Sequence, residues 1–371
     1  MAVMGTRPEA IKVAPIVLEL EKYASEIETC LVLTAQHREM LDQVVSLFDL
    51  RFQHDLGVMR PGQTLAELTS RLVAALDLIM GQEKPQLVLV QGDTTSTFVG
   101  ALVAFYHRIP VGHIEAGLRS FDKDHPFPEE VNRTLTTSLS ELHFAPTQRS
   151  AANLKAEGID PSKIFITGNP VIDALLKIRN KKLPFRNEQL QKIDFKRYRT
   201  VLLTAHRREN FGAPLEDICQ AVLRLVERFD DLLVVCPVHL NPRAGDPVRK
   251  YLGNTERIWL VPPLSYEDLV AVMERSYLIL TDSGGIQEEA PALGKPVLVL
   301  REVTERPEGI AAGTVQVVGT DTENIVKAAS TLLEDSQVYA TMANAVNPYG
   351  DGLAAQRIVD LIRQYFNRTL A

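Results

Sequence analysis

The chain has 371 residues, of which 45% are hydrophobic and 23% charged, and its formal net charge at pH 7 is -7. This length predicts two domains with separate cores, and the composition is that of a soluble globular protein. The negative charge argues against a general nucleic-acid-binding protein, and no apolar stretch is long enough to span a bilayer. Cys30, Cys219 and Cys236 lie in or beside apolar runs, so we expect buried thiols in a cytoplasmic protein.

The first half of the chain alternates between short apolar runs and segments with helical periodicity. Strands are expected at residues 1–4, 28–34, 86–90, 110–114, 141–145 and 163–167. Helices are expected after residues 5–9 and 35–39, within residues 61–81, and at residues 129–139. Pro15 predicts a kink or a late start of the first helix, because proline removes a hydrogen bond and clashes with the preceding turn.

Polar loops that contain glycine follow several of these strands. Arg7 and Lys12 lie near the opening of the first helix, where they are either anion ligands or solvated surface cations. Asp93 and Glu115 follow two later strands, and Glu129 opens a helix. Ligands of open parallel sheets bind at the carboxyl edge, and carboxylates that converge there can divide acid and base roles. Each of these carboxylates taken alone is more often structural.

Glu129 and Arg133 are four residues apart, which places them on one face of the expected helix. A pair of this kind is most simply a surface salt bridge that contributes little to stability.

The second half of the chain repeats the alternation after a break. Lysine and arginine accumulate in residues 177–199, which we interpret as a solvated linker. Strands are expected at residues 200–204, 232–236, 258–261, 277–280, 296–300 and 315–318, with helices near residues 215–229 and 265–275. The chain ends in a long amphipathic helix, residues 352–367. The pattern predicts an α/β protein with two Rossmann-like, doubly wound domains.

Residues 281–289 form the most informative stretch, in which an apolar run ends in a double-glycine turn and a helix begins. We expect the Ser283 hydroxyl to cap this helix and its free N–H groups to offer an anion site. Glu288 and Glu289 are expected in the first turn of the helix, as helix polarity favours. Arg306 follows the next strand and lies at the same sheet edge. The alternative is a capped turn without a ligand.

His206 heads a basic cluster after the first strand of the second half. With Arg207 and Arg208 it indicates contact with a phosphate group, although a single histidine in this place is usually a capping or packing residue. No glycine-rich dinucleotide motif and no phosphate-binding P-loop is present. Cys236 and His239 have no second pair to complete a zinc site, so we expect neither a metal ion nor a cofactor.

Eight motifs in the chain are similar to motifs of one enzyme family and occur in the same order. They are Gly5-Thr6-Arg7-Pro8-Glu9-Ala10, Thr34-Ala35-Gln36-His37-Arg38-Glu39, Gln91-Gly92-Asp93-Thr94, His113-Ile114-Glu115-Ala116-Gly117, Pro128-Glu129-Glu130-x-Asn132-Arg133, His206-Arg207-Arg208-Glu209, Pro237-x-His239-x-Asn241-Pro242 and residues 282–289. These motifs span nearly the whole chain. In them the chain resembles the non-hydrolysing bacterial UDP-N-acetylglucosamine 2-epimerases.

The resemblance implies the glycosyltransferase-B (GT-B) architecture with the active site in the interdomain cleft. The expected parts are an N-terminal Rossmann-like domain at 1–170, a C-terminal nucleotide-binding domain at 171–348, and a helix at 349–371 that packs back on the first domain. The implied reaction interconverts UDP-N-acetylglucosamine and UDP-N-acetylmannosamine by anti elimination of UDP to 2-acetamidoglucal and re-addition. It also implies a homodimer that serves cell-envelope polysaccharide biosynthesis.

The resemblance assigns roles by motif. The implied catalytic residues are Asp93, Glu115, Glu129 and His206. The implied substrate-binding residues are Arg7, Lys12, Arg133, Ser283, Gly284, Gly285, Glu289 and Arg306. A second UDP-N-acetylglucosamine that promotes activity in many members implies regulatory roles for Gln36, His37 and His239.

Three other functions stay open on sequence alone. A hydrolysing variant would release free N-acetylmannosamine and UDP, and a glycosyltransferase of the same architecture would transfer sugar to an acceptor. A non-catalytic sensor of nucleotide sugars would bind through the anion site and would keep all its function in an Asp93→Asn variant.

Overall fold

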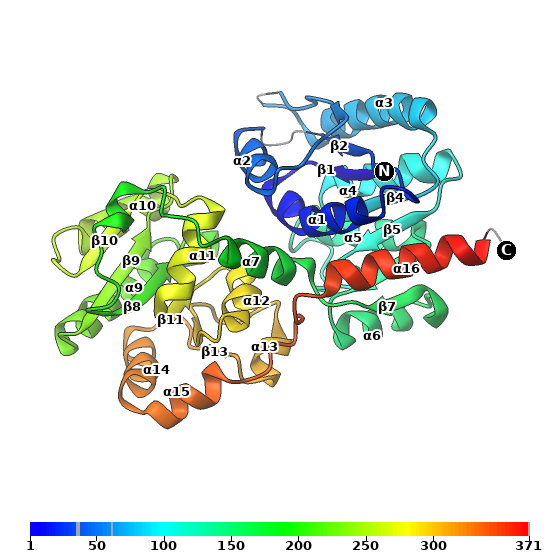
Figure 1. Ribbon diagram of the computed structural model, residues 1–371. Helices are drawn as coiled ribbons and strands as arrows, with labels where there is room; N and C mark the ends of the chain where they lie inside the picture. The colour runs from blue at the N-terminus through cyan, green and yellow to red at the C-terminus, as the bar shows by residue number, and fades with distance from the viewer. Residues whose placement is uncertain (35–37, 61, 370–371) are drawn as a thin grey trace. The chain divides into compact units, whose positions relative to one another are not determined.

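The chain divides into two compact α/β units (Figure 1), seen in a computed structural model that describes residues 1–34, 38–60 and 62–369. The first unit consists of Met1–Ala174 with Tyr349–Ala371, and the second of Leu175–Pro348. Each unit is built on one sheet of parallel strands connected by helices, which confirms the predicted fold class.

The first unit has the strand order β3-β2-β1-β4-β5-β6-β7. Its strands are β1 Ala2–Met4, β2 Leu31–Leu33, β3 His54–Asp55, β4 Val88–Gln91, β5 Val111–Ile114, β6 Leu142–Ala145 and β7 Ile164–Ile166. Its helices are α1 Arg7–Leu20, α2 Arg38–Phe48, α3 Leu65–Glu83, α4 Thr95–Tyr106, α5 Glu129–Leu139, α6 Gln148–Ala156, the start of α7 Pro170–Lys181, and α16 Ala354–Thr369. Strands β1, β2, β4, β5 and β6 are buried on both faces, as a sheet covered by helices on both sides requires.

Helix α1 begins at Arg7 because Thr6 and Glu9 form a capping box. The Thr6 hydroxyl accepts from the Glu9 N–H, and the Glu9 carboxylate accepts from the Thr6 N–H. The helix then runs through Pro15 to Leu20, so of the two predicted outcomes, a kink or a late start, the late start is wrong. The cap fixes the first turn, and the buried face around Pro15 keeps the helix packed despite the lost hydrogen bond.

Helix α16 belongs to the first unit, where it packs against α1 (Figure 1). The Asp173 carboxylate accepts from the N–H groups of Ala354 and Ala355 at 3.2 and 2.8 Å. It thereby provides an acceptor for two backbone N–H groups at the start of the helix, which have no partner within the helix. Burial raises the pKa of Asp173 to about 6, and these two hydrogen bonds oppose the shift. The Arg357 guanidinium donates to the Thr167 carbonyl at 3.1 Å, which provides a second anchor for the helix.

The second unit has the strand order β10-β9-β8-β11-β12-β13, the order of a dinucleotide-binding fold. Its strands are β8 Arg199–Thr204, β9 Leu232–Pro237, β10 Ile258–Val261, β11 Ser276–Thr281, β12 Val297–Val299 and β13 Val315–Val317. Its helices are the end of α7, α8 Glu188–Gln191, α9 Ala213–Arg228, α10 Pro242–Leu252, α11 Tyr266–Arg275, α12 Gly284–Ala292, α13 Pro307–Ala311, α14 Thr322–Glu334 and α15 Ser336–Ala343.

The segment 177–199 is more ordered than the linker that we predicted. It contains the end of α7 and the short helix α8, whose N-cap Asn187 accepts from the Gln189 and Leu190 N–H groups. The Asp268 carboxylate accepts from the N–H groups of Arg186 and Asn187 at 2.9 and 3.0 Å, which ties the segment to the second unit.

The thiols differ in burial. Cys219 and Cys236 are buried, as predicted, whereas Cys30 is only half-buried because it precedes β2 rather than lying within the strand. Among the described residues, no helix combines the length and the apolar character that are needed to cross a membrane.

Two buried histidines, His113 and His143, are register partners on β5 and β6. Burial lowers the pKa of His143 from its ordinary value of 6.5 to about 4. The imidazole therefore binds a proton more readily in the unfolded chain than in the folded one. Its contribution to the free energy of unfolding is complete above pH 6.5 and is lost as the pH falls towards 4. We expect this loss to reach about 3 kcal/mol.

The variant His143→Leu is therefore expected to flatten the decline of the urea unfolding midpoint between pH 6.5 and 4. A matched control is His107→Gln, because His107 is partly exposed and pairs with Asp77 at 2.7 Å. Equal pH profiles for His143→Leu and the parent chain would contradict the prediction.

Candidate functional site

The polar residues of the first unit gather at the carboxyl ends of β1, β4 and β5. The strand order reverses between β1 and β4, and ligands of doubly wound sheets bind at this switch point. Gly92 follows β4 with a φ of 78°, and Glu115 follows β5 with a φ of 64°. A positive φ is costly for glutamate, so the surrounding contacts must hold Glu115 in this conformation.

Glu115 is buried among donors. The Lys12 ammonium lies 2.5 and 2.6 Å from its two carboxylate oxygens, and the Asn169 amide donates to Oε1 at 3.0 Å. The Gln91 amide donates to Oε2. A cation and two amides therefore fix a buried carboxylate at the sheet edge, which is suited to a positive charge that develops during a reaction.

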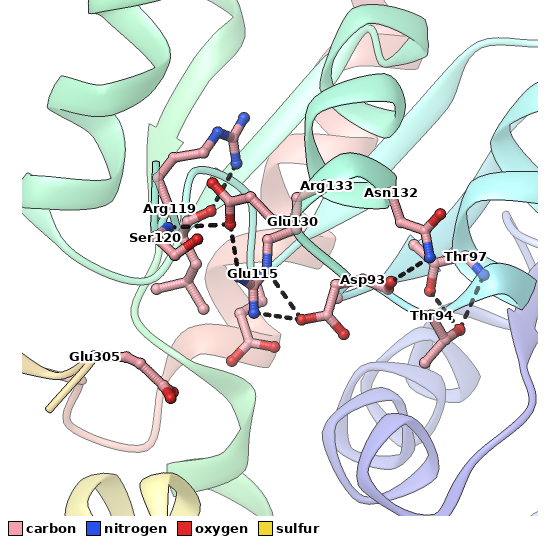
Figure 2. A network of polar contacts seen from close by, with 12 residues as sticks. Asp93, Thr94, Thr97, Glu115, Arg119, Ser120, Glu130, Asn132, Arg133 and Glu305 are labelled. Carbon is pink, nitrogen blue, oxygen red and sulfur yellow. Dashed lines mark hydrogen bonds and ion pairs between the residues drawn. The ribbon is translucent and has the colours of Figure 1, made fainter. Parts of the chain in front are cut away.

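Asp93 lies in a second network, shown in Figure 2. The Arg133 guanidinium donates to Asp93 Oδ2 at 3.0 and 2.6 Å and to Glu130 Oε2 at 2.9 Å. The Asn132 amide donates to the Asp93 carbonyl at 2.9 Å, so the loop after β4 is held by consecutive residues of α5. Although burial lowers the pKa of Arg133, Asp93 and Glu130 raise it above its usual range.

Glu129 is the first residue of α5 and is half-buried. The surface salt bridge that its spacing from Arg133 predicted is wrong, because the Arg133 guanidinium points to Asp93 and Glu130. Glu129 Oε2 has no hydrogen-bond partner among the described residues. This oxygen is therefore a buried acceptor without a described donor.

Glu9 was not among the predicted site residues, yet its side chain connects two loops at the sheet edge. Its buried carboxylate accepts from the Gly5 and Thr6 N–H groups at 2.8 and 2.6 Å, and from the hydroxyls of Thr94 and Thr97 at 2.6 and 2.9 Å. Burial raises the pKa of Glu9, and these hydrogen bonds oppose the shift. One side chain thereby joins the loops that follow β1 and β4. The spacing Thr6-x-x-Glu9 was the available signal, since it is a capping box.

The second unit has its own switch point between β8 and β11, where Asp282 is fully buried. Asp282 Oδ2 accepts from the N–H groups of His206 and Arg207, both at 2.7 Å, and from the Asn210 amide at 3.1 Å. The Thr204 and Thr281 hydroxyls meet at 2.6 Å between the two strands. Asp282 therefore holds the loop that carries His206 against the loop before α12.

His206 stacks on His239, with ring centroids 5.3 Å apart and an interplanar angle of 4°. Burial lowers the pKa of His206, Asp282 raises it, and His239 and Arg207 lower it further. The balance leaves the pKa of His206 below its ordinary value. The stack joins a residue with a predicted catalytic role to one with a predicted regulatory role.

Helix α12 begins at Gly284 with Ser283 as its N-cap, but the Ser283 hydroxyl makes no capping hydrogen bond. That part of the prediction is wrong, and the Ser283 N–H donates to the Thr281 hydroxyl at 3.0 Å. Glu288 and Glu289 lie in the second turn rather than the first, since the helix starts four residues before Glu288.

The double glycine is not needed for the turn. Neither Gly284 nor Gly285 is among the described residues with a positive φ, and a Cβ atom at either would make only ordinary contacts. Near Gly284 these contacts would be with Arg207, Glu305 and Arg306. The glycines therefore keep the helix N-terminus open in a charged setting, as an approaching anion requires.

Acidic and basic side chains behind this helix are paired. The Arg306 guanidinium donates to Glu288, and the Tyr266 hydroxyl donates to Glu289 Oε1 at 2.7 Å. Burial raises the pKa of Glu305, but the nearby arginines, Arg207 foremost, hold it below its usual range. Glu289 keeps a second carboxylate oxygen near Gly285.

Three predicted residues remain to be placed. Arg7 is the first residue of α1 and is partly exposed. Gln36 and His37 lie outside the described residues.

Comparison with known proteins identifies the family. Residues 19–363 match the family model described as UDP-N-acetylglucosamine 2-epimerase. The UDP-N-acetylglucosamine 2-epimerase of Bacillus subtilis is 51% identical, with 97% of this chain and 93% of the relative covered. The Escherichia coli enzyme of that name is 50% identical, with 98% of each chain covered.

A solved structure agrees with the sequence relatives. The crystal structure of UDP-GlcNAc 2-epimerase from Neisseria meningitidis bound to UDP-GlcNAc has a TM-score of 0.89 and 47% identity, with 98% of this chain and 99% of that chain covered. With the family model and two relatives near 50% identity, the similarity extends over nearly the full length. The chain therefore belongs to the UDP-N-acetylglucosamine 2-epimerase family of enzymes.

Proposed function

We propose that this protein interconverts UDP-N-acetylglucosamine and UDP-N-acetylmannosamine by anti elimination of UDP and re-addition, without net hydrolysis. The observation that carries the proposal is the pair of fixed carboxylates at one sheet edge, Glu115 held by Lys12 and Asp93 held by Arg133. Glu129, the first residue of α5, has a buried carboxylate oxygen without a described donor. The Neisseria meningitidis relative was crystallised with UDP-GlcNAc, which supports this substrate.

The elimination route answers a chemical difficulty. The C2 proton of the sugar is not next to a carbonyl group, so direct abstraction would be very slow. When the C1–O bond breaks first, UDP leaves with the electron pair and the sugar gains oxocarbenium character, which acidifies C2–H. A carboxylate then takes the proton and the C–H electrons form the C1=C2 double bond of 2-acetamidoglucal. Re-addition of UDP at C1 and of a proton on the opposite face of C2 completes the epimerisation.

The two units contribute different groups. Glu115, with its fixed donors, is suited to stabilising positive charge on the sugar. Asp93 and Glu129 are the remaining candidates for proton transfer, and Lys12 and Arg133 position the carboxylates. We assign Arg7, His206, Ser283, Gly284 and Gly285 to the departing diphosphate, Glu289 to the ribose hydroxyls, and Arg306 to the nucleotide.

Bond cleavage at C1 is tested with UDP-N-acetylglucosamine carrying ¹⁸O in the sugar–phosphate bridge. Cleavage makes the bridging oxygen equivalent to the terminal oxygens of UDP, so re-formed substrate is expected to carry ¹⁸O in non-bridging positions. Epimerisation without this exchange would rule the elimination out. Accumulation of free N-acetylmannosamine in proportion to turnover would instead place the chain in the hydrolysing class, and transfer to an added acceptor would indicate a glycosyltransferase.

A regulatory effect is expected in the reverse direction. UDP-N-acetylmannosamine alone should turn over poorly until some UDP-N-acetylglucosamine is present, because we assign Gln36, His37 and His239 to a second molecule of the latter. The stack of His239 on His206 offers a direct contact between that site and the diphosphate ligand. The reverse progress curve should show a lag that added UDP-N-acetylglucosamine removes. A linear curve that is insensitive to the addition would contradict the assignment.

We also propose a homodimer formed through the first unit. Helix α4 packs between α3 and α5, and these three helices expose large apolar side chains, namely Leu78, Phe105, Tyr106, Val131 and Leu135. Exposed apolar groups of this size on neighbouring helices are typical of a subunit interface. Light scattering should give twice the chain mass, and Phe105→Glu with Leu135→Glu should reduce it to the monomer value. A parent chain that is monomeric at micromolar concentration would contradict the proposal.

A further inference from the structure

Cys30, His54 and Glu83 form a cluster of metal-ligating groups in the first unit. Their ligand atoms all lie within 4.8 Å of one another. The cluster lies at the amino edge of the sheet, because Cys30 directly precedes β2, His54 opens β3, and Glu83 ends α3 before β4. The carboxylates assigned to catalysis lie at the opposite, carboxyl edge, so the cluster is separate from the site described above.

The chain holds these groups in place. Gln53 exchanges two hydrogen bonds with Leu31, from its N–H to the Leu31 carbonyl at 3.0 Å and from the Leu31 N–H to Gln53 Oε1 at 2.7 Å. These bonds join the residues that directly follow Cys30 and directly precede His54. The His54 imidazole meets Glu83 Oε1 at 2.7 Å. Three different segments are therefore brought to one point.

The donor set is that of a transition-metal ion. A thiolate, an imidazole and a carboxylate are the groups that bind Zn²⁺, at about 2.3, 2.0 and 2.1 Å, and in the usual tetrahedral geometry two ligand atoms lie roughly 3.3 to 3.7 Å apart. The three ligand atoms of the cluster lie within 4.8 Å of one another, so the widest separation would close by up to about 1 Å when an ion binds. His54 and Glu83 are 23% and 40% exposed, which leaves access for an ion and for a water molecule as fourth ligand.

We propose that Cys30, His54 and Glu83 bind one Zn²⁺ ion, or a divalent ion of similar ligand preference, in a site that ties β2, β3 and α3 together. The charged groups around the thiol are of both signs. Burial raises the pKa of Cys30, the Met1 amino group lowers it, and the negative charges of Glu83 and Glu28 raise it again. Because the thiol must lose its proton to bind the metal, affinity should increase with pH.

The test uses the full chain without a histidine tag, stripped with a chelator and titrated with Co²⁺ and then Zn²⁺. One equivalent of Co²⁺ should produce a cobalt–thiolate charge-transfer band, and Zn²⁺ should displace it. Cys30→Ser should abolish the band. His54→Gln and Glu83→Gln should weaken binding at least about tenfold, the lower bound for loss of an outer-shell partner of a metal ligand.

A matched control separates this site from ordinary surface binding. His107 and Asp77 form another partly exposed pair with the same 2.7 Å separation, and their positions are not part of the cluster. His107→Gln should leave the titration unchanged. The metal-free His54→Gln variant should keep the parent's circular-dichroism melt and its epimerase rate, which shows that lost binding is not lost folding. A Co²⁺ complex without a thiolate band, no stoichiometric binding, or equal effects of His54→Gln and His107→Gln would overturn the proposal.

Discussion

Replacing Glu115 by glutamine is expected to lower kcat for epimerisation by about 10²- to 10⁴-fold, the range of a positioned acid–base or charge-stabilising group. The amide keeps the shape of the side chain but removes its negative charge. The Lys12 ammonium, 2.5 Å from Glu115 Oε1, would then add uncompensated positive charge where the sugar develops its own. Steady-state kinetics in both directions measure the effect, and calorimetry with UDP measures nucleotide binding, which should change little.

The matched control for Glu115→Gln is Glu141→Gln. Glu141 also pairs with a lysine, Lys163, at 2.9 Å, but both side chains are about 40% exposed and lie away from the switch point. The Glu141→Gln variant should have the same kcat as the parent chain. A Glu115→Gln variant with parental kcat, or one that fails to bind UDP, would contradict the proposed role.

Replacing Glu9 by alanine is expected to lower the free energy of unfolding of the first unit by about 4 kcal/mol or more, since four donors lose their acceptor at a cost of at least about 1 kcal/mol for each buried group. Activity should fall as well, because the loop that carries Asp93 loses its link to the loop after β1. The urea midpoint and the kinetics of the folded variant measure the two effects separately.

Glu67→Ala provides the control, because Glu67 forms the same capping box with Thr64 at the start of α3. The capping box of Thr64 and Glu67 is exposed, and its hydrogen bonds join only these two residues at the start of α3. Its loss should shift the urea midpoint far less than Glu9→Ala and leave the kinetics unchanged. Equal shifts in the two variants would show that Glu9 acts only as a helix cap.

The sequence predicted the parts of the fold that depend on local patterns. Helix α5 at Glu129–Leu139 and strand β10 at Ile258–Val261 have the predicted bounds, because proline, periodicity and apolar runs mark them locally. Strand β3, His54–Asp55, was missed because two residues carry no periodicity. Helices α10, α13, α14 and α15 were missed as well, two of them no longer than eight residues.

The contacts within the site depend on where loops distant in sequence come together. Arg133 has carboxylates three and four residues before it, and only the position of the loop after β4 makes Asp93 and Glu130 its partners. The link from Glu9 to Thr94 spans 85 positions, so no local pattern contains it. Motifs thus selected Asp93 and Glu115 as candidates, whereas the contacts of Glu9, Gln91 and Asn169 required the structure.

The most direct test of the elimination mechanism is proton NMR of UDP-N-acetylglucosamine incubated with the protein in deuterated water. The mechanism predicts UDP-N-acetylmannosamine with deuterium at C2, because the proton taken by the carboxylate exchanges with solvent before C2 is reprotonated. UDP-N-acetylmannosamine that retains its C2 proton, or free N-acetylmannosamine as the accumulating product, would contradict it.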